Sequence, residues 1–73
     1  MDEKTLEITI KAYLREMRER LNEAAAIAKA ADACAEAGSI KKAVEVALDI
    51  EQLVYEVNTF LNAASMMNRI WKS

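Results

Sequence analysis

The sequence predicts an all-α fold: an antiparallel helical hairpin of two long helices that assembles with a second copy into a four-helix-bundle homodimer. Its 73 residues include no proline and one glycine. That glycine, Gly38, directly precedes Ser39, and apolar residues recur at steps of three and four on both sides of this pair. Two helices of so short a chain bury only one side each, which favours self-association. We therefore expect a single helical-hairpin domain over residues 1–73.

The first helix is expected at about residues 5–37, where apolar residues follow adjacent lines. One line is a heptad seam formed by Ile10, Leu14, Met17, Leu21, Ala24, Ala28, Ala31 and Ala35. A second line, at multiples of seven residues, is formed by Leu6, Tyr13, Ile27 and Cys34. Arg20 interrupts the second line, and its charged end is expected to reach the edge of the bundle or to pair across it. A buried face three positions wide is typical of a bundle rather than of a two-stranded coil.

The turn between the helices is expected at residues 38–39. Glycine is the residue best able to adopt the left-handed conformation that ends a helix. Serine is among the best residues for accepting the free amide protons that begin one. Gly38 is therefore expected to close the first helix, and Ser39 to cap the second.

The second helix is expected at about residues 40–71, without a break. Its apolar residues form three lines: Ile40, Ala47, Val54 and Leu61; Ala43, Ile50, Val57, Ala64 and Trp71; and Val46, Leu53, Phe60 and Met67. Three lines allow contact with two neighbours, namely the first helix and the same helix of a second subunit. Asn68 occupies an inner heptad position, where a polar residue can fix the register and the number of subunits.

The composition argues against catalytic, metal-binding and membrane-spanning functions. The chain has no histidine, one cysteine and a net charge of −2. We find no metal-ligand cluster, no phosphate-binding glycine loop and no nucleophile with a base, so we predict no enzyme, no cofactor and no metal site. Cys34 is expected to be a small core residue. With an acidic amino terminus and no long apolar run, the chain is expected to be cytoplasmic and not to enter a membrane.

A cluster of large apolar residues at the open end of the hairpin predicts a contact surface. The expected partner or dimer interface consists of Leu6, Ile10, Tyr13, Leu53, Val57, Phe60, Leu61, Met66, Met67, Ile70 and Trp71. This surface could complete the homodimer or receive an amphipathic helix of another protein, to which flexible methionines adapt well. The first functional hypothesis is therefore a non-enzymatic protein–protein interaction module, acting as an adaptor, a regulator or a small chaperone.

A basic stripe on the first helix supports an alternative hypothesis. Its members fall within about one-sixth of the helix circumference and are Lys4, Lys11, Arg15, Arg18, Asn22 and Lys29. Paired basic helices of a dimer can lie along the phosphates of structured RNA, which would make the chain an RNA-binding regulator. Against this, glutamates border the stripe and no aromatic residue lies within it to stack on bases. A solvated charged face is the more common meaning of such a pattern.

Overall fold

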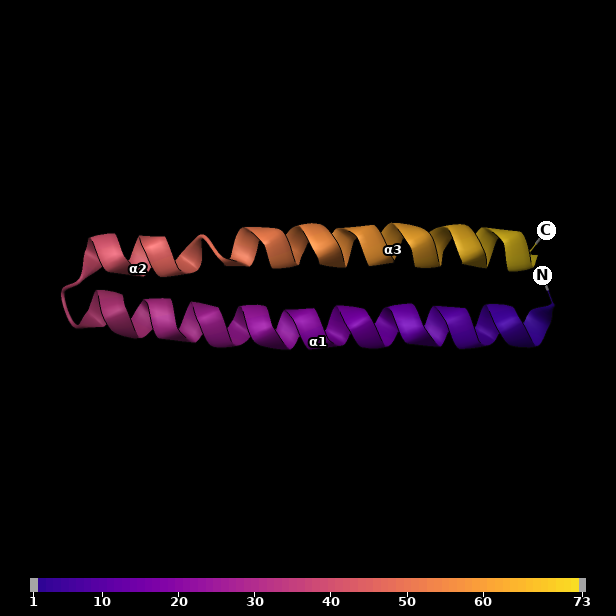
Figure 1. The fold of residues 1–73 in the computed structure, drawn as a ribbon, viewed down its shortest axis with the longest axis horizontal. Helices are drawn as coiled ribbons and strands as arrows, with labels where there is room; N and C mark the ends of the chain where they lie inside the picture. The colour runs from indigo at the N-terminus through magenta and orange to yellow at the C-terminus, as the bar shows by residue number, and fades with distance from the viewer. Residues whose placement is uncertain (1, 73) are drawn as a thin grey trace.

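The computed structural model describes residues 2–72 and shows an antiparallel helical hairpin. Its elements are α1 (Glu3–Glu36), α2 (Ile40–Ala47) and α3 (Ile50–Lys72). In Figure 1, α2 and α3 follow one another along a line beside α1, and the two ends of the chain lie at the same end of the rod. The Cα atoms span 54 × 14 × 12 Å. The predicted all-helical hairpin is confirmed.

The first helix begins two residues earlier than expected because Asp2 caps it. The Oδ1 atom of Asp2 accepts a hydrogen bond from the Thr5 backbone N–H at 2.7 Å, in the usual geometry of an N-cap. This bond to the Thr5 amide lowers the pKa of Asp2, because it stabilises the ionised carboxylate. The cap explains why helical structure starts at Glu3.

Gly38 ends α1 as predicted. Its φ of 91° lies in the left-handed region. The Gly38 N–H donates to the Ala35 carbonyl and the Ser39 N–H donates to the Cys34 carbonyl, each at 2.9 Å. These two bonds form a Schellman motif, which satisfies carbonyl groups that the helix end leaves free.

Ser39 does not cap α2 through its side chain, contrary to the sequence-based prediction. Its hydroxyl makes no cap hydrogen bond, and its φ of −92° and ψ of 66° differ from the extended conformation of a typical N-cap. The backbone carbonyl of Ser39 accepts the Ala43 N–H at 2.9 Å instead. The Schellman motif thus fixes the backbone of Ser39 in a conformation that leaves the hydroxyl out of the cap.

The second helix is divided at Leu48 and Asp49, whereas the sequence predicted no break. The Asp49 N–H donates to the Val46 carbonyl at 3.3 Å, and the Glu51 N–H donates to the Leu48 carbonyl at 3.1 Å. Both bonds span three residues, as in a 3₁₀ turn, rather than four. Aspartate is a weak helix former that favours the position just before a helix start, and Asp49 occupies that position ahead of Ile50.

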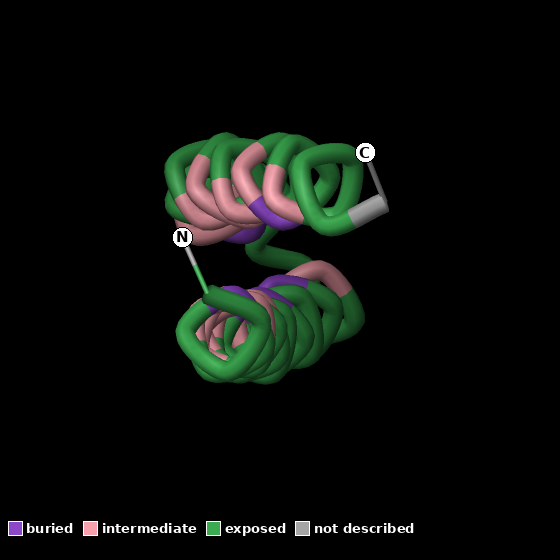
Figure 2. The backbone as a smooth tube through the Cα atoms, turned by 90° about the vertical axis from the view of Figure 1, so that its right-hand side faces the viewer, coloured by how far each residue is buried: buried purple, intermediate pink, exposed green. Residues whose placement is uncertain are grey.

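The core of the hairpin is small and consists mainly of alanine. The buried side chains are Leu6, Ala24, Ala31, Ala43 and Ala64. Buried and half-buried residues lie on the facing sides of the two rods, and exposed residues cover the outer sides (Figure 2). Leu6 is the best-covered of the buried residues, at 3% exposure.

The second predicted line of α1 and alternate members of its predicted heptad seam face the other rod. On α1, the buried and half-buried residues that follow a regular heptad pattern are Leu6, Ile10, Tyr13, Met17, Arg20, Ala24, Ile27, Ala31 and Cys34. On the other rod they are Ala43, Val46, Ile50, Leu53, Val57, Phe60, Ala64 and Met67. The predicted heptad seam of α1 is therefore only partly within the hairpin, because its members Leu14, Leu21 and Ala28 are exposed. We call these buried and half-buried residues of the two rods the hairpin seam.

Candidate protein–protein interface

One edge of the hairpin seam is closed by a charged network centred on Arg20. Its Nε donates to Glu56 Oε1 at 2.9 Å, and its Nη1 donates to Glu16 Oε1 at 2.8 Å and to the Glu16 carbonyl at 3.2 Å. The guanidinium also lies 4.8 Å from the centre of the Phe60 ring. The expectation that Arg20 pairs across the bundle is confirmed, since Glu56 belongs to the opposite rod.

The network shifts the pKa values of Arg20 and Glu56 in favour of their charged forms. Hydrogen bonds to Glu16 and Glu56 raise the pKa of Arg20. The pKa of Glu56 is lowered, first by the Gln52 side-chain amide, which donates to Oε2 at 3.1 Å, and then by Arg20. The carboxylate of Glu56 therefore connects the two rods and is held by a neighbour on its own helix.

The opposite edge of the hairpin seam is apolar and mostly exposed. In an antiparallel helix pair, each edge of the seam is lined by one row of flanking residues from each helix. The two rows at one edge occupy the same heptad position on both helices. Glu16 and Glu56 meet through Arg20 at one edge, so the other edge carries Leu14, Leu21, Ala28 and Ala35 of α1 together with Ile40, Ala47, Val54 and Leu61 of the other rod. We call these eight residues the lateral apolar face.

The large side chains of the lateral apolar face are about half exposed to solvent. Leu14, Leu21 and Leu61 are each 50% exposed, Val54 is 52% exposed and Ile40 is 60% exposed. The Arg20–Glu56 ion pair sets the register of the two rods. Because the rods are antiparallel, each residue further along α1 lies level with one residue earlier on the other rod. Leu14 then lies level with Leu61, Leu21 with Val54, Ala28 with Ala47, and Ala35 with Ile40. The face forms four successive layers, large towards the open end and smaller towards the turn.

The predicted open-end interface is divided between the hairpin seam and the surface. Seven of its members lie in the hairpin seam, buried or half-buried: Leu6, Ile10, Tyr13, Leu53, Val57, Phe60 and Met67. Tyr13 and Phe60 pack with their ring centres 5.8 Å apart. The other four, Leu61, Met66, Ile70 and Trp71, are exposed. Whether these four contact a partner stays a prediction.

The interface prediction omitted four large residues of the lateral apolar face. The predicted apolar lines include Leu14, Leu21, Ile40 and Val54, but the predicted interface does not. Their signal is the seven-residue spacing from Leu14 to Leu21 and from Val54 to Leu61, which continues as alanine towards the turn. The spacing in the sequence therefore marks these residues as one apolar face. Only the pairing of the rods shows that neither rod covers this face.

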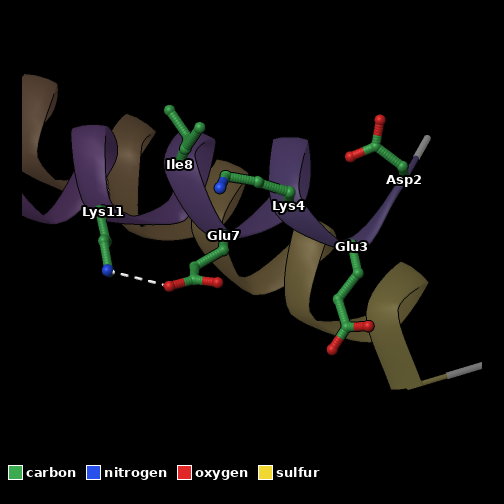
Figure 3. A pocket seen from close by; sticks show the side chains of 6 residues that line it. All are labelled: Asp2, Glu3, Lys4, Glu7, Ile8 and Lys11. Carbon is green, nitrogen blue, oxygen red and sulfur yellow. Dashed lines mark ion pairs between the residues drawn. The ribbon is translucent and has the colours of Figure 1, made fainter.

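The basic stripe lies on the exposed surface of α1. All six of its members, Lys4, Lys11, Arg15, Arg18, Asn22 and Lys29, are exposed. Lys11 pairs with Glu7 at 2.9 Å within a shallow hollow at the start of α1, which is also lined by Asp2, Glu3, Lys4 and Ile8 (Figure 3). Acidic side chains thus outnumber basic ones around this part of the stripe.

No protein-family model matches the chain, and neither a characterised protein nor a solved structure is significantly similar to it. Across residues 2–72, no three histidine, cysteine, aspartate or glutamate side chains gather as metal ligands would. No helix in the described part of the chain combines the length and the apolar character needed to cross a membrane. The surfaces of the hairpin are therefore the features that bear on its function.

Proposed function

We propose that this chain is a non-enzymatic protein–protein interaction module that works as a homo-oligomer and acts as an adaptor, a regulator or a small chaperone. The observation that carries this proposal is an imbalance of apolar surface. Among the described residues, the buried core consists of Leu6 and four alanines, whereas twelve large apolar side chains are exposed. Exposed apolar patches of this extent mark contact surfaces.

Energetic considerations support association. Fully burying a leucine or isoleucine side chain stabilises a protein by about 1.5–3 kcal/mol, so a half-exposed one retains about half of that gain for a partner. The single hairpin has no large side chain that is fully buried among the described residues. A hairpin of this size does not offset the entropy of ordering its residues, and association supplies the missing burial.

The open end provides a second apolar surface, suited to a different kind of partner. Met66 and Trp71 are exposed in the last part of α3. Methionine side chains are flexible and polarizable, so they adapt to the apolar face of an amphipathic helix. We propose that this end receives such a helix from another protein, in the cytoplasm, where a sole cysteine such as Cys34 stays reduced.

The proposal is tested by measuring molecular mass and helical content together as the protein is diluted. Sedimentation velocity and circular dichroism from about 100 µM down to about 10 nM should show a multimer that loses mass and helix together, because folding is linked to association. A fully helical monomer with a cooperative thermal transition at the lowest concentration contradicts the proposal.

RNA binding through the basic stripe is the alternative function, and retention on structured RNA tests it. The stripe is exposed, which the alternative requires, but Glu7 already neutralises Lys11. Under the alternative, the double variant Arg15→Gln and Arg18→Gln would lose retention on structured RNA at low salt while keeping its mass. Under the interaction-module proposal, wild-type protein and this variant show no difference in RNA retention.

A further inference from the structure

We propose that a second copy of the chain covers the lateral apolar face, with the two turns at opposite ends of the resulting four-helix bundle. This inference rests on the proposed self-association and adds which face is used and how the copies are oriented. The charged network of Arg20, Glu16 and Glu56 lies at the other edge of the hairpin seam, so the continuous row of apolar residues that includes Leu14, Leu21, Val54 and Leu61 lies at one edge. Two copies that meet through the same single face form a closed pair rather than an open chain of subunits.

A two-fold axis can relate the copies in two ways, and side-chain size distinguishes them. With both turns at the same end, each layer of the lateral apolar face meets the layer at its own level. Leu14 would then pack on Leu61 of the second copy, and Ala28 would pack on Ala47 of the second copy. The bundle would be overfilled towards the open end and would leave space near the turn, and both conditions are unfavourable in a packed core.

With the turns at opposite ends, large residues meet smaller ones. Leu14 lies over Ala35 of the second copy, and Leu21 lies over Ala28 of the second copy. On the other rod, Val54 lies over Ala47 of the second copy, and Leu61 over Ile40. Each layer then contains a similar volume, which allows the four helices to stay at even spacing along the bundle.

The register of the hairpin is compatible with this arrangement. The pairs on α1 place the two-fold axis level with the boundary between Ala24 and Ala25, and the pairs on the other rod place it level with the boundary between Ile50 and Glu51. The Arg20–Glu56 ion pair sets these two levels opposite one another to within about one residue. One two-fold axis can therefore satisfy both rods.

Charges at the rim also favour opposite ends. Arg18 and Asp32 are exposed next to the lateral apolar face on its α1 side. Opposite-end packing brings Arg18 beside Asp32 of the second copy, and the symmetry repeats this pair, whereas same-end packing brings Arg18 beside an asparagine, Asn58. Glu51 approaches its own counterpart near the axis, but it is exposed, so solvent screens the repulsion.

The area of the face is sufficient for a dimer. From residue 14 to residue 35, α1 advances about 32 Å, and two adjacent helices are about 20 Å wide, which gives on the order of 600 Å² for each copy. Stable interfaces begin at about 1,200 Å² in total, so this one lies at the lower end of the range. A second copy covers the face without any further partner.

Pairs of nitroxide spin labels test the orientation of the copies directly. In a Cys34→Ala background, one label is placed by Ser39→Cys at the turn and, in a separate protein, by Lys4→Cys near the start of α1. Opposite-end packing predicts distances between copies of about 40 Å at the turn and about 60 Å at the start of α1, from the helix rise. Distances below about 25 Å at both sites mean that the turns lie together and overturn the proposal.

A matched pair of substitutions tests the face. Leu21→Glu places a charge on the lateral apolar face and should weaken dimerisation at least 100-fold. Ile8→Glu changes a similarly exposed residue outside this face and should leave dimerisation unchanged. If Leu21→Glu still dimerises with unchanged affinity, another face is used: the inference fails, while the proposed self-association stands. If the unmodified protein is monomeric, both fail.

A charge exchange serves as a further check that does not depend on apolar packing. Arg18→Asp alone and Asp32→Arg alone should each weaken the dimer several-fold, and the double variant should recover it. Recovery supports opposite-end packing, because same-end packing does not bring these residues together. No recovery in a folded double variant counts against it.

Discussion

Replacing Gly38 by alanine should destabilise the hairpin through its backbone alone. A Cβ atom added at Gly38 would meet nothing within 4 Å, so no steric contact contributes to the effect. The φ of 91° is the cause, because an L-residue in the left-handed region costs about 1–2 kcal/mol relative to its preferred conformations. Alanine also restricts the unfolded chain, which offsets about 0.4–1 kcal/mol. The net expected loss is about 1 kcal/mol per chain.

Urea denaturation at a fixed protein concentration measures this loss. For a chain of this size the dependence of the unfolding free energy on urea is about 1 kcal/mol per M, so the midpoint should fall by about 1 M. Gly38→Asn should lose less, because asparagine tolerates the left-handed region. Chemical synthesis with D-alanine at position 38 should lose nothing, since a D-residue favours positive φ. An L-alanine variant as stable as the original protein would refute the assignment of Gly38 as the residue that ends α1.

Two further predictions concern the hairpin seam. Ala31→Leu should cost about 1–3 kcal/mol of unfolding free energy in thermal or urea denaturation, because a buried position at the seam has no room for a larger side chain. Ala33→Leu, at an exposed position of the same helix, should cost little, and equal effects of the two would contradict the observed seam. Glu56→Gln should destabilise the protein near pH 7 but not at acidic pH. The folded-state pKa of Glu56 lies below its ordinary value of 4.5, so its contribution is complete above that value and is lost as the pH falls through the folded-state pKa. A difference between wild type and Glu56→Gln that stayed constant from pH 7 to pH 2 would mean that the carboxylate has no favourable contact in the fold.

The hairpin itself was predictable because its signals are local. The absence of proline, the periodic apolar residues and the lone glycine at Gly38 each act within a few residues, and each had the predicted consequence. The break at Leu48 and Asp49 was not predictable in this way. No glycine or proline marks it, and the helix propensities of ordinary residues differ by only a few tenths of a kcal/mol per position.

The choice of contact lines could not be predicted because it depends on pairing between distant residues. Three apolar lines on each helix are compatible with more than one seam. The ion pair of Arg20 with Glu56, 36 residues away, and the ring contact of Tyr13 with Phe60 select one of them. For the same reason, residues such as Phe60 and Met67 were predicted at a surface but are used within the hairpin, while Leu14 and Leu21 are left outside it.

The division of the second rod affects how the chain reaches its folded state. At eight residues, α2 is too short to be helical by itself in water, whereas α1 has 34 residues and Asp2 to start it. The backbone turn at Leu48 and Asp49 separates α2 from the longer α3, so helix cannot simply extend from α3 into α2. We therefore expect the turn end of the rod to become ordered only when α2 docks against α1, in the step that closes the hairpin.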